Sequence, residues 1–91
     1  MSRAEDVLER MKRSPSGYSP SDFKTLYVGY GFEWREGKGG HTVYTHSKHK
    51  TLRVVVPRHN LKPAYAREAI KMIDKLLELE AHEEQNPEDK M

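Results

Sequence analysis

Four of the five histidines of this chain stand between residues 41 and 59, in a segment that is basic throughout. Histidine is the side chain that exchanges a proton near neutral pH, and lysine and arginine attract phosphate groups. Residues 37–67 contain no Asp or Glu but seven basic residues: Lys38, Lys48, Lys50, Arg53, Arg58, Lys62 and Arg67. This pattern predicts a surface for a phosphodiester polyanion, used either for binding or for proton-transfer chemistry.

His41 follows Gly39 and Gly40 at the start of an expected strand. Taken alone, such a histidine is an exposed imidazole at a strand end. A metal site is the other alternative, because several histidines are close in sequence. His41 and His46 are separated by an odd number of residues, however, and therefore point to opposite faces of a regular strand. With no cysteine in the chain and no nearby carboxylate, we expect no metal.

Two further side chains have competing interpretations. His59, just after Pro57, is expected to hydrogen-bond the backbone of a turn rather than to act in catalysis. Trp34 could stack on a nucleic-acid base. Its alternation with Phe32 favours a place in the core instead.

Composition limits the class of protein. Ninety-one residues suffice for one small domain with a single core. The net charge of +2 conceals an asymmetry, since six of the last fourteen residues are acidic: Glu78, Glu80, Glu83, Glu84, Glu88 and Asp89. The absence of cysteine, of a signal-peptide pattern and of a membrane-spanning apolar run predicts a cytoplasmic protein.

Helix signals are strong at three places. Ser2 and Glu5 have the spacing of a capping box before an apolar stripe that ends near Met11. After a turn-rich connector over 14–20, Ser19 and Asp22 repeat that spacing before a helix expected to end at Gly31. A long helix is predicted from Pro63 to about Asn86, with a wide apolar arc: Tyr65, Ala66, Ala69, Ile70, Met72, Ile73, Leu76 and Leu77. One stripe of this arc should cover the sheet, and the other should meet the first helix or a partner chain.

Three strands are predicted between the second and the last helix, at residues 32–36, 41–46 and 51–56, with turns at 37–40 and 47–50. The order helix, helix, strand, strand, strand, helix predicts an α+β fold with a three-stranded antiparallel sheet and helices packed on one face. We expect residues 1–18 to form an N-terminal helix and connector, 19–82 the main domain, and 83–91 an acidic, disordered tail.

An ordered set of short motifs resembles the HicA family of toxins, over roughly residues 19–77. The set consists of Gly31-Phe32, Arg35, Gly40-His41 with the following strand Thr42-Val43-Tyr44, Val56-Pro57-Arg58-His59, Leu61-Lys62-Pro63, Ala66-Arg67 and Ile70. Two departures stand out. Gly40 replaces the family's serine, which removes a hydroxyl but leaves a backbone amide free to approach phosphate. The segment after His59 is also about one residue shorter than the common form.

The resemblance implies a double-stranded-RNA-binding-domain-like fold, an mRNA interferase activity that needs no metal or other cofactor, and a HicB-type antitoxin as partner. It matches His41 to the family's catalytic histidine, which acts as acid or base when the RNA 2′-OH attacks the adjacent phosphate. The expected RNA-binding residues are Arg35, Lys38, Gly39, Gly40, Lys48, Lys50, Arg53 and Arg58.

Two other functions remain open. The same fold could serve as a non-catalytic module for double-stranded or structured RNA. A protein-interaction adaptor that uses the last helix and the acidic tail would explain the wide apolar arc, but it leaves the basic segment without a role. His41 separates the first two alternatives, because a pure binding module needs no histidine beside a glycine pair.

Overall fold

The two N-terminal helices each begin at a serine that caps the helix. In the computed structural model, which describes residues 2–85, these helices are α1 (Arg3–Arg13) and α2 (Pro20–Gly29). The Ser2 hydroxyl accepts a hydrogen bond from the Glu5 amide at 3.2 Å, and the Glu5 carboxylate accepts one from the Ser2 amide at 2.9 Å. Ser19 and Asp22 form the same reciprocal pair. Both predicted capping boxes are confirmed.

A glycine with a left-handed backbone leads from α2 into the sheet. Tyr30 caps the end of α2, and Gly31 follows with a φ of 94°, a value that glycine adopts without steric cost. The chain then forms β1 (Phe32–Glu36), so the predicted helix end and the first strand are both confirmed.

The sheet is an antiparallel meander in the order β1-β2-β3. A single 3-10 turn, η1 (Lys38–Gly40), joins β1 to β2 (His41–His46). The third strand, β3 (Arg53–Pro57), begins two residues later than predicted, because the amide of Leu52 bonds back to the carbonyl of His49 within the hairpin turn. β2 is the central strand and pairs with both neighbours.

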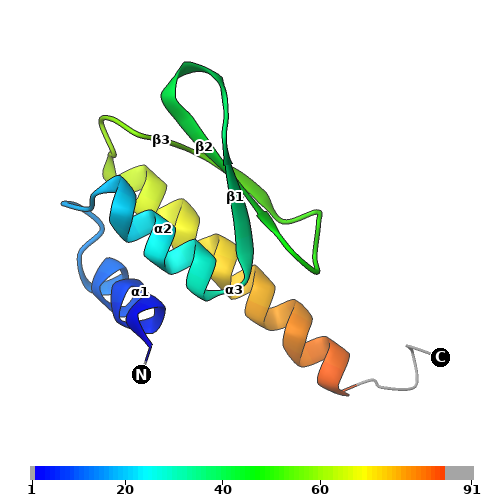
Figure 1. Cartoon of the computed structure of the whole chain (residues 1–91). Coiled ribbons are helices and arrows are strands. Elements are labelled where there is room, and N and C mark those ends of the chain that lie inside the picture. The colour runs from blue at the N-terminus through cyan, green and yellow to red at the C-terminus, as the bar shows by residue number, and fades with distance from the viewer. Residues whose placement is uncertain (1, 86–91) are drawn as a thin grey trace.

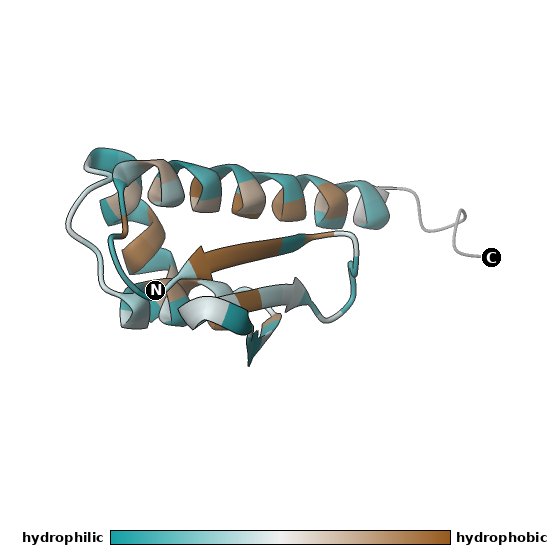
Figure 2. Ribbon diagram, turned by 90° about the horizontal axis from the view of Figure 1, so that it is seen from above, coloured by the Kyte–Doolittle hydropathy of each residue, from teal (hydrophilic) through white to brown (hydrophobic). Residues whose placement is uncertain are grey.

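All three helices lie on one side of the sheet (Figures 1 and 2). The long helix α3 (Pro63–Gln85) and α2 pack with the sheet around one core, while α1 contacts α2 and α3. The second apolar stripe of α3 therefore meets the first helix. Leu77, at one margin of the predicted arc, is exposed. Residues 83–85 of the predicted tail are helical, and residues 86–91 lie outside the described part of the chain.

The core lies between the helices and one face of the sheet, which we call the inner face. Tyr27 from α2 stacks on Tyr44 from β2 with ring centroids 4.6 Å apart, and Phe32 meets Tyr27 edge-on at 5.1 Å. Around these rings pack Val7, Leu8, Met11, Phe23, Leu26, Leu52, Val54, Val56, Ala66, Ala69, Ile73 and Leu76. Residues from α1 belong to this core, so the N-terminal helix shares one hydrophobic interior with the rest of the fold.

Trp34 is not part of the core, contrary to the expectation from its alternation with Phe32. It lies on the inner face, opposite Tyr44, but remains 46% exposed. The reason is that β1 is an edge strand, and the nearest cover from α2 at this point is a charged side chain. The Lys24 ammonium stands 3.6 Å from the centre of the indole ring.

No helix within residues 2–85 combines the length and apolar composition needed to cross a lipid bilayer.

The close approach of α1 and α2 generates a prediction about stability. A methyl group at Gly29 would overlap the Cβ of Ala4, which is itself buried. We predict that Gly29→Ala lowers the free energy of unfolding by roughly 1 kcal/mol, because overpacking costs ~1–3 kcal/mol. That cost exceeds the gain of about 1 kcal/mol that alanine normally brings to a helix. Urea denaturation measures the change.

The matched control is the double variant Gly29→Ala/Ala4→Gly, which removes the overlapping methyl group. Its destabilisation should be smaller than the sum of the two single changes. A Gly29→Ala protein more stable than the parent would contradict the packing of α1 on α2.

Candidate functional site

The turn before β2 determines how the His41 side chain is held. Gly39 and Gly40 have φ values of 70° and 75°, a region that side chains with a Cβ rarely adopt. The turn brings the carbonyl oxygen of Lys38 to 3.1 Å from Nδ1 of His41. Because a carbonyl oxygen can only accept, Nδ1 of a neutral His41 carries the proton, and Nε2 keeps its lone pair. His41 is partly exposed, so this nitrogen is available as a base.

Arg58 contacts the turn through both its backbone and its side chain. Its backbone amide donates to the Gly40 carbonyl at 3.0 Å, and its guanidinium donates to the Glu36 carboxylate at 2.9 Å. The same guanidinium lies 3.9 Å from the position that a Cβ of residue 40 would occupy. The Arg58 guanidinium is therefore held beside Gly40 as one half of an ion pair with Glu36. The left-handed backbone conformation of residue 40 favours glycine over any residue with a Cβ.

The predicted RNA-binding residues divide into two groups. Lys38, Gly39, Gly40 and Arg58 surround His41 at one end of the sheet. Arg35 pairs with Val43 on the outer face, which is the face without helices. Val43 is two residues from His41 on β2, so Arg35 is a diagonal neighbour of His41 on that face.

The second group lies at the opposite end of the sheet. Arg53 pairs with Thr45, four residues along β2 from His41, which corresponds to about 13 Å. Lys48 and Lys50 belong to the turn between β2 and β3, beyond that pair. These residues extend the basic surface, but they do not surround His41.

His46 has a structural role. It is 3% exposed on the inner face, opposite Phe32, so the prediction that His41 and His46 point to opposite faces is confirmed. Its Nδ1 accepts hydrogen bonds from the amides of Lys48 and His49, both at 3.1 Å. Its Nε2 lies 3.0 Å from the Tyr30 carbonyl and donates to it. His46 thus joins the end of α2 to the β2–β3 turn.

The two remaining histidines of the basic segment lie apart from His41. His49 Nε2 is 3.1 Å from a carboxylate oxygen of Glu83, a contact that becomes an ion pair when the imidazole is protonated. His59 is exposed, and its side chain has no hydrogen-bond partner among residues 2–85, contrary to expectation. The turn there is made instead by Asn60, which has a φ of 57°. Within the described residues, no three His, Asp or Glu side chains are grouped as metal ligands.

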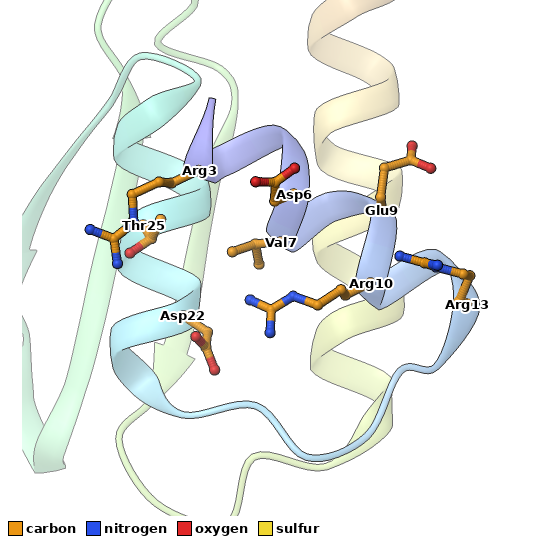
Figure 3. Close-up of a pocket in the computed structure, with 8 residues that line it drawn as sticks. All are labelled: Arg3, Asp6, Val7, Glu9, Arg10, Arg13, Asp22 and Thr25. Atoms are coloured by element: carbon orange, nitrogen blue, oxygen red, sulfur yellow. The ribbon is translucent and has the colours of Figure 1, made fainter. Parts of the chain in front are cut away.

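Two surface hollows were not anticipated from the sequence. One lies between α1 and α2 and contains three arginines and three carboxylates, so its charges balance (Figure 3): Arg3, Arg10, Arg13, Asp6, Glu9 and Asp22. The other lies on the inner face near the end of the sheet that carries His41, and Trp34 and Arg58 contribute to its wall. The only sequence signal for the second was a lone tryptophan among charged residues.

Comparison with models of protein families, with curated proteins and with solved structures gave no match to this chain. The resemblance to HicA toxins therefore stays a prediction, and function is inferred from the geometry around His41.

Two histidines of β2 are predicted to have opposite neutral tautomers. His41 should carry its proton on Nδ1, which donates to Lys38, and His46 should carry its proton on Nε2, which donates to Tyr30. Long-range ¹H–¹⁵N spectra of the imidazole rings above pH 8 distinguish the tautomers directly. Equal mixtures of tautomers at His41 would contradict its hydrogen bond to the turn.

Proposed function

We propose that this chain is an endoribonuclease toxin of the HicA type, which cleaves messenger RNA in the cytoplasm with His41 as its catalytic residue. One observation carries the proposal. The hydrogen bond from Nδ1 to the Lys38 carbonyl fixes a partly exposed imidazole against a basic turn and leaves the lone pair on Nε2, the nitrogen not bonded to the turn. A histidine that served only to cap a strand would not require two consecutive glycines with left-handed backbones beside it.

The chemistry proposed at this site is the transfer of a phosphoryl group within the RNA. Nε2 of His41 takes the proton of a 2′-OH, and the 2′ oxygen attacks the adjacent phosphorus. The bond from phosphorus to the 5′ oxygen breaks, which leaves a 2′,3′-cyclic phosphate and a 5′-OH end. The imidazolium formed in the first step carries the proton that the leaving oxygen requires.

Charge develops on the non-bridging phosphate oxygens during this attack, and the residues around His41 can stabilise it. Arg58 brings a guanidinium to the turn, held there by Glu36 and by its own backbone bond to Gly40. Lys38 adds a second cation, and the glycines allow a phosphate to approach their amides closely. No step of this mechanism needs a metal or an organic cofactor.

A toxin needs an inhibitor, and the outer face of the sheet suits one. Val55 is 43% exposed on the outer face of the edge strand β3, two residues from Arg53 and separated from Arg35 by Val43 of the central strand. We propose that a HicB-type antitoxin with acidic side chains covers this face and His41 together. Such a partner would bury an apolar centre and neutralise the surrounding charges, as stable interfaces do.

We predict that His41→Ala abolishes RNA cleavage and growth arrest, with a rate loss of at least 10²-fold, because the general base is removed. The measurement is cleavage of purified mRNA in EDTA, followed on gels, with circular dichroism to verify folding. His82→Ala, a change at an exposed histidine of α3, is the matched control and should cleave at the parent rate. A fully active His41→Ala protein would exclude His41 as the catalyst, and loss of parent activity in EDTA would exclude the metal-free mechanism.

The two groups of basic residues are predicted to differ in their effects. Replacing Lys48 and Lys50 with glutamine should weaken RNA affinity and reduce the slope of log affinity against log salt by about 1–2, because fewer counterions are released. The rate at saturating RNA should be nearly unchanged. Replacing Lys38 and Arg58 should lower that rate as well. If all four changes alter binding alone, Lys38 and Arg58 do not stabilise the charge that develops on the phosphate during cleavage.

A further inference from the structure

The hollow on the inner face is built at the edge where α2 stops covering the sheet. We call it the Trp34 hollow, and its lining includes Lys24, Trp34, Glu36, Thr42, Tyr44 and Arg58. Its volume of about 270 Å³ lies just below the usual range of small-molecule sites. A space of this size suits one flat ring system rather than a larger ligand.

Trp34 supplies an aromatic surface that the fold itself leaves partly uncovered. The indole is 46% exposed, although it belongs to the face of the sheet that holds the core. Lys24 places its ammonium 3.6 Å from the ring centre and also lines the hollow. Proteins that bind single-stranded nucleic acids commonly combine an exposed aromatic side chain with a nearby basic residue. A base stacks on the aromatic ring, and the basic residue neutralises the adjacent phosphate.

Hydrogen-bonding groups complete the lining. Tyr44 is among the residues that line the hollow although it is only 2% exposed, and its hydroxyl has no hydrogen-bond partner among residues 2–85. Burial raises the pKa of Tyr44 to about 12, so this hydroxyl keeps its proton and can donate. Ser21 and Thr42 add two more hydroxyls. Hydroxyls can serve as donors or acceptors, which suits the edges of different bases.

Arg58 connects the hollow with the catalytic turn. It contributes to the lining, yet its guanidinium also lies beside Gly40, directly before His41. His41 pairs with Pro57 at the same end of the sheet, and it projects from the outer face because it is three residues from the inward-pointing Tyr44. A nucleotide chain that passes the end of the sheet would therefore meet His41, Arg58 and the hollow in turn.

We propose that the Trp34 hollow binds one unpaired nucleobase of the RNA, next to the phosphate held by Arg58 and the Gly39–Gly40 turn. This inference rests on the proposed function, and it specifies the substrate as a single-stranded or looped segment. Bases in a duplex are stacked on each other and paired, so a duplex cannot place one in the hollow without opening.

The test uses the full chain with His41→Ala, so that RNA stays intact during the measurement. Trp34 is the only tryptophan in the sequence, and its fluorescence reports directly on the hollow. Three probes are compared: a short single-stranded RNA, the same RNA annealed to its complement, and an abasic ribose-phosphate oligomer of equal length. A fluorescent label on each probe gives its affinity independently by anisotropy.

Single-stranded RNA is expected to quench Trp34, whereas the abasic oligomer should bind through its phosphates without quenching. Trp34→Ala should weaken single-stranded RNA about tenfold, as loss of one stacked base does, and Trp34→Phe should retain most of the affinity. Leu77→Ala, which truncates a similarly exposed apolar residue on α3, is the control and should bind normally.

Two results would overturn the inference. One is equal quenching by the abasic oligomer, because displacement of Lys24 by phosphate would then explain the signal. The other is parent-like RNA affinity of Trp34→Ala, which would leave the exposed indole to a protein partner. Either result leaves the cleavage assay with His41 untouched. Conversely, RNA-dependent quenching with no cleavage by the parent protein would support the base site and reject the nuclease.

Discussion

The pairing register of β2 is the constraint on which the rest of the structure depends. Tyr44 points inward and stacks on Tyr27 at the centre of the core, so every second residue of the strand follows it inward. His41 is three residues from Tyr44 and therefore points outward. A slip of one residue would bury the imidazole of His41 and expose Tyr44. The core thus selects the orientation of the candidate catalytic residue.

The two histidines of this strand show how one residue type acquires two roles from its surroundings. His46 is enclosed, and three backbone groups use both of its ring nitrogens. His41 has one nitrogen engaged by the preceding turn and the other open to a ligand. The difference arises from the neighbouring backbone, since a two-glycine turn precedes one histidine and a tight polar hairpin follows the other.

Local signals in the sequence predicted most of the fold. The capping boxes at Ser2 and Ser19, the glycine after α2 and the strand at residues 41–46 were predicted from local sequence, and all of them are confirmed. The place of Trp34 could not be predicted in this way, because alternation tells which face a residue occupies but not whether a helix covers that face. Local signals also did not reveal how far apart Lys48 and Arg58 lie in the folded chain. Both belong to one basic segment, yet the hairpin carries them to opposite ends of the sheet.

The composition of the core has a consequence for the order in which the protein can form during synthesis. The strands pair only with their neighbours in sequence, so the sheet requires nothing beyond residue 57. Its inner face, however, is covered in part by Ile73 and Leu76 of α3, and α3 also contacts α1. A nascent chain that ends before these residues lacks a large part of the apolar cover that holds β2 in register. We therefore expect the arrangement around His41 to become stable only after the ribosome has made α3 as far as Leu76.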